Sequence, residues 1–176
     1  MKNLIRLLSL SESWGKLMFD RGKPEAALLL DLLREKKLHI STAESCTGGM
    51  IATSLTAISG SSDVVNGGIV SYTNEIKHNM LGVKTETLEK YSAVSEECTK
   101  EMAEGAARLL NTEVSVSVSG YAGPSGGTAE KPVGTVCFGF YVQGKTSSAT
   151  KHFIGDRANV RREAVLFAIH SLVEKL

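Results

Sequence analysis

A serine and a cysteine stand side by side in the segment AESCTGG, residues 43–49, directly before two glycines. Either side chain can act as a nucleophile toward a carbonyl carbon. The segment joins a predicted strand to a predicted helix, so several backbone N–H groups should gather near Ser45. Such groups suit an oxyanion or a phosphate, whereas the simpler interpretation is that Ser45 or Thr47 only caps the helix.

A second candidate nucleophile lies in GPSGG, residues 123–127, which matches the pattern G-x-S-x-G. Asp156 and His170 follow Ser125 in the chain order of a hydrolase triad. A nucleophile elbow, however, needs a strand immediately before its serine and a helix immediately after it. Here Pro132 and another predicted strand follow, so we interpret Ser125 as a loop residue.

Other motifs for catalysis or cofactor binding are weaker. Ser13 and Lys16 form an S-x-x-K pattern, but its usual partners S-D-N and K-T-G do not occur. The four histidines show neither H-x-x-x-H nor H-E-x-x-H spacing, which argues against a metal site. The sequence also lacks G-x-x-x-x-G-K-[ST] and G-x-G-x-x-G, so we expect no cofactor.

The composition is that of one globular domain. The chain has 176 residues, with 20 Lys and Arg against 19 Asp and Glu, and no long run of one charge. This balance argues against nucleic-acid and membrane-surface partners. Three widely spaced cysteines suit reduced thiols in a cytoplasmic protein. We interpret the start, MKNLIRLLSL, as a terminal helix, and no apolar run approaches the ~18 residues that would span a membrane.

Strands and helices alternate along the chain. Strands are predicted over residues 38–43, 67–73 and 114–120, and in a hairpin over 134–142 and 145–154. Helices are predicted over residues 24–36, 48–58, 95–110 and 155–176, with one or two helical turns over 74–81. The strict alternation of VSVSVSG, residues 114–120, predicts a half-buried strand. The order of elements implies an α/β fold, a three-layer α/β/α sandwich with a mixed sheet. The long loop that is rich in glycine and proline, residues 120–134, is a candidate for a functional role.

Five motifs occur in a fixed order along the chain. They are TAESCTGG (42–49), GGIVSYTNEIKHNMLGV (67–83), AVSEE (93–97), SGYAGPSGG with EKPVGTV (119–136) and GDR (155–157). Together they resemble the C-terminal domain of the competence/damage-inducible protein CinA, which is found alone as nicotinamide-nucleotide amidase. The resemblance covers about residues 36–175. We therefore expect residues 1–35 to form an N-terminal helical extension and residues 36–176 to form the amidase domain.

The resemblance implies an amidase that converts nicotinamide mononucleotide to nicotinate mononucleotide and ammonia. It implies Ser45 as the nucleophile, with Tyr72 and Lys77 of the S-Y-x-N-x-x-K segment as the base system. For the nucleotide we expect contacts from Thr47, Gly48, Gly49, Ser119, Gly123, Gly126, Gly127, Lys131 and Arg157. The expected partners are this small nucleotide and further copies of the chain in a homo-oligomer. The alternative is a non-catalytic nucleotide-binding or regulatory module of the same fold.

The residues favour the same chemistry without the resemblance. Since Ser45 has no convincing histidine partner, a lysine is the simplest base, as in known Ser-Lys hydrolases. The pKa of lysine must fall from ~10.4 to roughly 7–8, a change of about 4 kcal/mol, which partial burial and a nearby cation can supply. Tyr72 would pass the proton or orient Lys77. Adjacent residues at a helix start differ by about 100° in direction, so we expect Cys46 to be a small buried hydrophobe.

Overall fold

A computed structural model describes residues 22–176 of the chain, so Ser13, Lys16 and the helix predicted at the start lie outside the described residues. Five strands form one sheet in the order β2-β1-β3-β4-β5. Their bounds are β1 Ile40–Glu44, β2 Val65–Val70, β3 Val114–Gly120, β4 Thr135–Val142 and β5 Lys145–His152. Strands β2, β1 and β3 run parallel, whereas β4 and β5 form an antiparallel hairpin beside β3. The predicted mixed sheet is confirmed.

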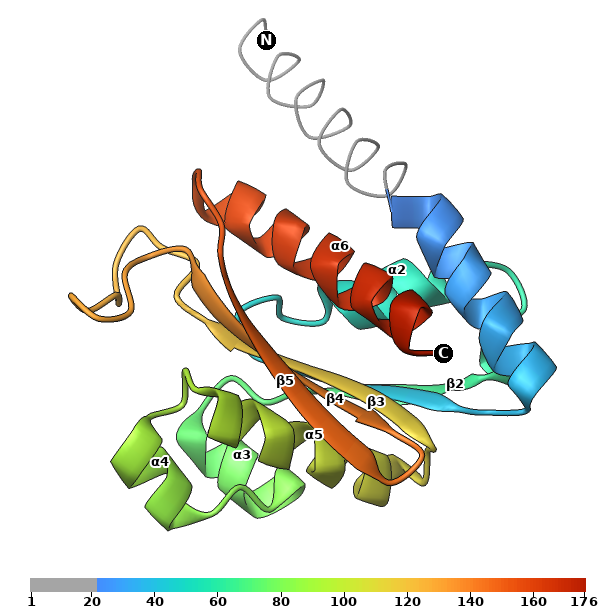
Figure 1. The fold of residues 1–176 in the computed structure, drawn as a ribbon, viewed down its shortest axis with the longest axis horizontal. Helices are drawn as coiled ribbons and strands as arrows, with labels where there is room; N and C mark the ends of the chain where they lie inside the picture. The colour runs from blue at the N-terminus through green and yellow to red at the C-terminus, as the bar shows by residue number, and fades with distance from the viewer. Residues whose placement is uncertain (1–21) are drawn as a thin grey trace, which may run out of the picture.

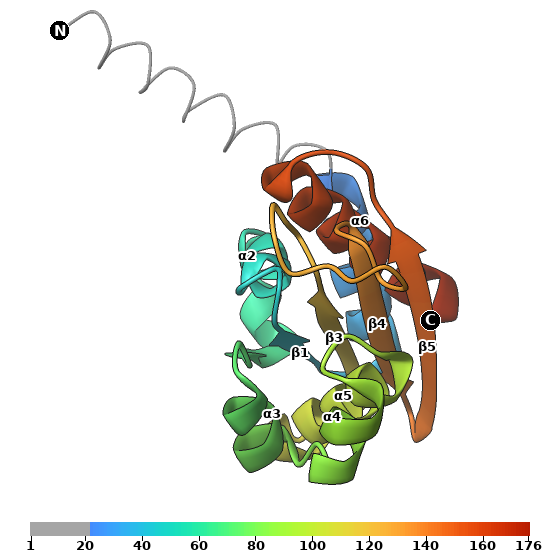
Figure 2. The same cartoon turned by 90° about the vertical axis from the view of Figure 1, so that its left-hand side faces the viewer.

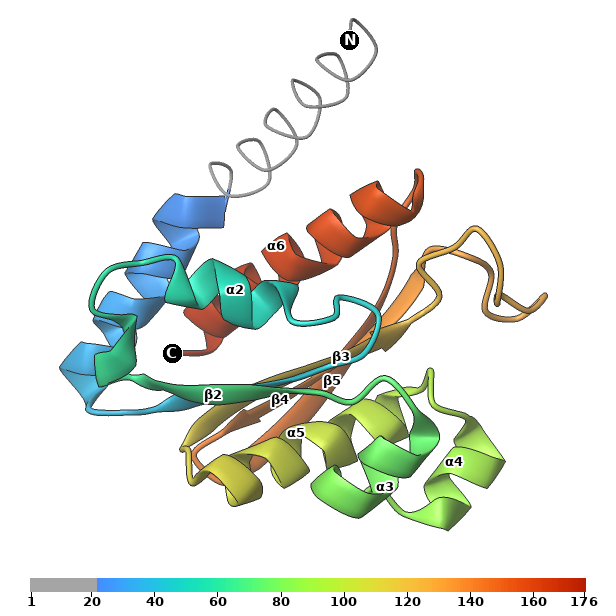
Figure 3. The same cartoon turned by 180° about the vertical axis from the view of Figure 1, so that it is seen from behind.

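Helices cover both faces of this sheet (Figures 1, 2 and 3). One layer holds the helix over residues 22–36, α2 (Met50–Thr56) and α6 (Arg157–Lys175), and the other holds α3 (Asn74–Leu81), α4 (Thr85–Tyr91) and α5 (Glu96–Leu110). A short 3-10 helix, η1 (Ser61–Asp63), precedes β2. The predicted three-layer α/β/α architecture is therefore confirmed, although α4 was not predicted. Its seven residues bury only Thr87, which leaves no apolar pattern to detect.

Strand β3 is buried on both faces, which corrects the prediction of a half-buried strand. Its valines belong to the larger hydrophobic core. The hydroxyls of Ser115 and Ser117 donate to backbone carbonyls of α5, at Ala103 (2.6 Å) and Thr99 (2.5 Å). The alternating pattern therefore separates an apolar face from a face whose hydroxyls bond to a helix, rather than core from solvent.

The core lies mainly between the sheet and the layer that contains α6. Leu29, Leu30 and Leu33 of the helix over residues 22–36 are fully buried in the same cluster as Phe138 and Val160. These buried leucines pack the helix over residues 22–36 against the sheet. On the opposite face Ser95 caps α5 as predicted, accepting a hydrogen bond from the N–H of Cys98 (3.2 Å). None of the helices in residues 22–176 is both long and apolar enough to cross a bilayer.

Candidate active site

The site lies at the carboxyl ends of two neighbouring parallel strands, β1 and β2. The helices that follow these strands lie on opposite faces of the sheet. After β1 the chain enters α2 on one face, and after β2 it enters α3 on the other (Figure 3). Such a change of side opens a crevice at the carboxyl ends of the strands, where α/β proteins bind ligands. Ser45 follows β1 directly and Lys77 lies on α3, so the topology brings both residues to the carboxyl ends of these two strands.

The amine of Lys77 contacts the hydroxyl of Ser45. Its Nζ donates to Ser45 Oγ (3.2 Å) and to the backbone carbonyl of Ser71 (2.7 Å). Lys77 is only 1% exposed, and no carboxylate of the described chain forms an ion pair with it. Burial lowers the pKa of Lys77, while the nearby thiols of Cys98 and Cys46 act in the opposite direction. An amine with a lowered pKa beside a hydroxyl is suited to accept the proton of that hydroxyl.

Cys46 is not available as a nucleophile. It is buried in the larger hydrophobic core as predicted, although it lies in the turn before α2 rather than in the first turn of the helix. Burial raises the pKa of the Cys46 thiol to about 12, so the reactive thiolate is suppressed. Ser45, in contrast, is only half-buried, so its hydroxyl can be reached from outside.

Glu44, which sequence reasoning missed, fills the amino terminus of α2. Its carboxylate is 1% exposed and accepts five hydrogen bonds. Oε1 accepts from Thr42 Oγ1 (3.2 Å) and Ala52 N (2.8 Å), and Oε2 accepts from Thr47 Oγ1 (2.7 Å), Gly49 N (3.0 Å) and Ile51 N (3.0 Å). A carboxylate directly before the serine, at the start of a helix, was the signal that could have revealed this arrangement.

The carboxylate of Glu44 changes the role expected for the AESCTGG segment. The N–H of Gly49 is taken by Glu44, and the N–H of Gly48 donates to the carbonyl of Ser45 (3.2 Å). Neither Ser45 nor Thr47 caps α2, because its N-cap is Gly49, which adopts a left-handed φ of 93°. Within the turn of residues 45–49, the N–H groups of Cys46 and Thr47 make no hydrogen bond to another described residue. These two groups are the donors that the turn leaves for an oxyanion.

Tyr72 lies at the rim of the site rather than on Lys77. Its side chain is 62% exposed, and its hydroxyl makes no hydrogen bond to any described residue. The structure therefore brings Ser45 and Lys77 together but does not join the hydroxyl of Tyr72 to the amine. An exposed aromatic ring beside a reactive serine is instead placed to contact a bound substrate.

Two arginines of α6 reach the loops around Ser45. Arg161 Nη2 donates to the carbonyl of Thr47 (2.8 Å), and Arg157 Nη1 donates to the carbonyl of Gly123 (2.9 Å). The Nε of Arg161 is buried and has no partner. The sequence analysis named Arg157 as a contact of the nucleotide but did not select Arg161. Their spacing of four residues, which places both on one side of α6, was the available signal.

Lys131, the other expected phosphate ligand, has all its donors in use. Its Nζ donates to the carbonyls of Val94 (2.6 Å) and Tyr91 (3.1 Å) and to Ser92 Oγ (3.4 Å). An ammonium group has three N–H donors, so these acceptors satisfy it. Lys131 therefore fastens the glycine-rich loop to the end of α4 and is neither a free phosphate ligand nor a solvent-exposed side chain.

The remaining expected ligands are dispersed. Ser119 is buried near the end of β3, where it pairs with Cys137 of β4. Gly126 and Gly127 lie in the exposed part of the loop, whereas Gly123 is buried beneath Arg157.

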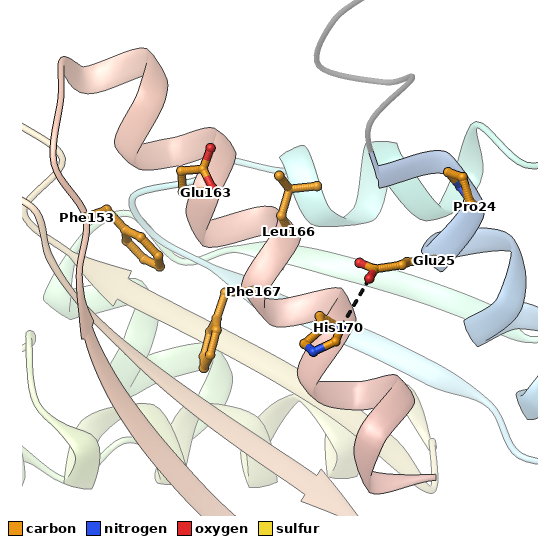
Figure 4. A pocket seen from close by; sticks show the side chains of 7 residues that line it. All are labelled: Pro24, Glu25, Phe153, Glu163, Leu166, Phe167 and His170. Carbon is orange, nitrogen blue, oxygen red and sulfur yellow. Dashed lines mark hydrogen bonds and ion pairs between the residues drawn. The ribbon is translucent and has the colours of Figure 1, made fainter.

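The alternative triad is not assembled. Ser125 is exposed in a loop between two antiparallel strands, so the interpretation as a loop residue is confirmed. Asp156 caps α6 by accepting from the N–H of Asn159 (2.8 Å). His170 pairs with Glu25 (3.1 Å) in the wall of a separate cavity of about 570 Å³ (Figure 4). In residues 22–176 no group of three or more His, Cys, Asp or Glu side chains could hold a metal ion.

Comparisons with known proteins point to one family. The family model of the CinA C-terminal domain matches residues 23–176. A protein described as competence-damage inducible in Clostridium beijerinckii is 55% identical over 141 residues, which is 80% of this chain and 34% of that protein. A CinA-like protein of Kosmotoga olearia is 46% identical over 159 residues, 90% of this chain and 39% of that protein. The chain thus spans little more than a third of the length of these relatives.

Solved structures match over nearly their whole length. Competence damage-inducible protein A (ComA) from Klebsiella pneumoniae shares 38% sequence identity with a TM-score of 0.85, and the match covers 88% of this chain and 96% of that chain. The competence/damage inducible protein CihA from Agrobacterium tumefaciens shares 41% identity with a TM-score of 0.83, over 86% of this chain and 93% of that chain.

Proposed function

This chain belongs to the CinA C-terminal domain family, and from that membership and the geometry of Ser45 we propose that it is a nicotinamide-nucleotide amidase. It hydrolyses nicotinamide mononucleotide to nicotinate mononucleotide and ammonia. The observation that carries the proposal is the buried amine of Lys77, 3.2 Å from Ser45 Oγ. This amine has a lowered pKa and no carboxylate partner in the described chain, so its neutral form is favoured.

In the first half of the reaction Ser45 attacks the carboxamide carbon. Lys77 takes the hydroxyl proton as the bond from Ser45 Oγ to carbon forms. The developing oxyanion is bound by the free N–H groups of Cys46 and Thr47, which the turn after β1 leaves without partners. When the tetrahedral intermediate collapses, the carbon–nitrogen bond breaks and the ammonium of Lys77 gives its proton to the departing NH2 group. Ammonia leaves and an acyl-enzyme remains on Ser45.

In the second half water replaces ammonia. Lys77, neutral again, takes a proton from water as its oxygen attacks the acyl carbon. The bond from carbon to Ser45 Oγ then breaks, and the proton passes from Lys77 to the serine. The acid product leaves with its carboxylate ionised, and the enzyme regains its starting state.

Recognition of the nucleotide rests on the rim of the site. The amino terminus of α2 is closed to a substrate phosphate by Glu44, and the donors of Lys131 are satisfied. We therefore assign the phosphate to Arg157 and Arg161, whose guanidinium groups retain unused N–H donors beside the Ser45 turn. Tyr72, which is exposed next to Ser71, is assigned to the pyridinium ring, since aromatic faces attract cations.

The test is ammonia release from nicotinamide mononucleotide by the wild-type chain, the Ser45→Ala variant and the Cys46→Ala variant. Ser45→Ala should lower turnover by several orders of magnitude with the fold retained, whereas Cys46→Ala should keep most activity. Wild-type chain that binds the mononucleotide without releasing ammonia would instead identify a binding or regulatory module. Loss of activity in Cys46→Ala but not in Ser45→Ala would overturn the choice of nucleophile.

A further inference from the structure

The hydroxyl of Ser71 is an unexplained polar group at the site. Ser71 is fully buried, and its Oγ has no hydrogen-bond partner. In residues 22–176 it is the one buried side-chain oxygen in this state, since the other two unpartnered atoms are arginine nitrogens. A buried hydroxyl without a partner is costly, so it calls for a water or a ligand that satisfies it.

Three other buried serines of the sheet have partners. Ser41 Oγ lies 2.7 Å from Thr112 Oγ1, and the hydroxyls of Ser115 and Ser117 donate to carbonyls of α5. The fold therefore satisfies this kind of group where the role is structural. Ser71 differs from these serines in its place, at the carboxyl end of β2 beside the reacting pair.

The backbone of Ser71 bonds to the residue before the nucleophile and to the base. Its N–H donates to the carbonyl of Glu44 (2.8 Å), the residue before Ser45, and its carbonyl accepts from Lys77 Nζ (2.7 Å). These two bonds fix the residue between the nucleophile and the base. The unpartnered hydroxyl thus belongs to the residue whose backbone carbonyl binds the amine that handles the protons of the reaction.

The reaction needs a binding group at this place. Hydrolysis of the acyl-enzyme requires a water molecule beside Lys77, and the amine donates to two serine oxygens of the protein, Ser45 Oγ and the carbonyl of Ser71. A serine hydroxyl can donate one hydrogen bond and accept others, as an attacking water requires. Full burial also lets such a site admit one ordered water while bulk solvent is excluded.

We propose that Ser71 is a further catalytic residue, whose hydroxyl binds the water that hydrolyses the acyl-enzyme. The inference rests on the proposed amidase function. In this step a water O–C bond forms and the Ser45 Oγ–C bond breaks. The water proton passes to Lys77 and from there to Ser45, while Ser71 gains and loses no proton.

The test compares Ser71→Ala with wild type in a rapid-quench experiment. In Ser71→Ala, the first equivalent of ammonia should appear at nearly the wild-type rate, followed by turnover slower by about tenfold or more. Mass spectrometry of acid-quenched protein should show the acyl group accumulating on Ser45. The melting temperature should be unchanged or higher, because the substitution removes an unsatisfied polar group.

Ser115→Ala is the matched control. It removes a buried hydroxyl that does have a partner, the carbonyl of Ala103, so it should lower the melting temperature without accumulation of acyl-enzyme. Wild-type turnover in Ser71→Ala, or equal slowing of both half-reactions, would overturn the role of Ser71 and leave the amidase proposal intact.

A second acyl donor separates the two proposals. With p-nitrophenyl acetate, Ser71→Ala should give a burst of p-nitrophenolate followed by a slower second phase than wild type shows. Failure of wild type to release ammonia from the mononucleotide would overturn the amidase proposal alone, since the ester arm still measures loss of the acetyl group. Equal second phases, or no acetyl group on Ser45 in either protein, would overturn the role of Ser71.

Discussion

The Nζ of Lys77 lies 3.2 Å from the Oγ of Ser45, although 32 residues separate them in the chain. Parallel pairing of β1 with β2 brings the two ends together, and the departure of α2 and α3 to opposite faces leaves the crevice between them. Lys77 is buried with no carboxylate partner among the described residues, and burial lowers its pKa. The surroundings of Lys77 therefore favour the neutral amine more than water does.

The activity should depend on pH through Lys77. Burial lowers its pKa, and the base must be neutral, so log(kcat/KM) should rise with pH and level off at the lowered pKa. Lys77→Met should abolish this rising limb and most activity. Lys77→Arg should not restore activity, because a guanidinium stays protonated. A profile that is flat in wild type from weakly acidic to alkaline pH would contradict this assignment.

The free energy of unfolding should also depend on pH through Lys77. The pKa of Lys77 is lower in the folded state than its ordinary value of 10.5, so the unfolded chain binds more protons between the two values. The free energy of unfolding therefore increases as the pH rises from the lowered pKa to the ordinary value, and it is lowest at pH values below the lowered pKa. Lys77→Met removes the penalty, so its gain in melting temperature over wild type should be larger at about pH 6 than at about pH 9.5. Thermal denaturation followed by circular dichroism measures the difference, and a gain that grows with pH would refute it.

Two substitutions of Tyr72 separate its possible roles. If the ring contacts the pyridinium, Tyr72→Phe should keep most of kcat/KM, whereas Tyr72→Ala should raise KM by about twofold to thirtyfold for a contact of about 0.5–2 kcal/mol. If the hydroxyl passes the proton, as the sequence first suggested, Tyr72→Phe should lower kcat as much as Tyr72→Ala does. Steady-state kinetics on the mononucleotide decide between them.

Glu44→Gln should weaken both the fold and the site. The new amide would direct N–H donors at the N–H groups that the carboxylate now accepts, so the free energy of unfolding should fall by about 2–4 kcal/mol. Since these bonds hold the turn that carries Ser45, kcat should fall more than KM rises. Glu101→Gln is the control, because Glu101 also accepts from a backbone N–H (Lys84, 2.8 Å) and a threonine (Thr87, 2.8 Å) at the start of α4. It should lower stability and leave kcat unchanged, and an equal loss of kcat in both variants would refute the role of Glu44.

The arginines of α6 should set the preference for a phosphorylated substrate. A charge-assisted contact to phosphate contributes about 1.5–3 kcal/mol, so kcat/KM should favour the mononucleotide over nicotinamide riboside by at least about tenfold. Arg157→Ala and Arg161→Ala should each reduce this ratio, mainly through the mononucleotide. Lys131→Ala should lower the melting temperature and leave the ratio unchanged, because its ammonium bonds to the protein. Equal efficiency of wild type on the two substrates would show that the phosphate is not recognised.

The layers of the fold could be predicted because each long element has a local signature. Ser95 marked the start of α5, and the hairpin of β4 and β5 was visible as two strands around a short turn. Where polar residues connect one helix or strand to the next, the observed bounds differ from the predicted ones. Strand β2 ends at Val70 rather than at Thr73, because Thr73 caps α3 by accepting from the N–H of Ile76.

The site could be predicted only as far as its motifs reach. The sequence selected Ser45 and Lys77, but the three bonds from Lys131 depend on contacts that only the folded chain creates. Lys131 bonds to residues about 40 positions earlier in the chain, and no local pattern indicates such a partner. The same limit hid Arg161, whose bond to Thr47 spans 114 residues.

That bond between α6 and the Ser45 turn has a consequence for the order in which the protein is made. The nucleophile, its base and the carboxylate that shapes the turn all lie between Glu44 and Lys77, in one continuous stretch of chain. The arginines belong to a helix synthesised about eighty residues later. The ribosome therefore synthesises Ser45 and Lys77 well before Arg157 and Arg161. The proposed phosphate ligands are thus the last part of the site to be synthesised.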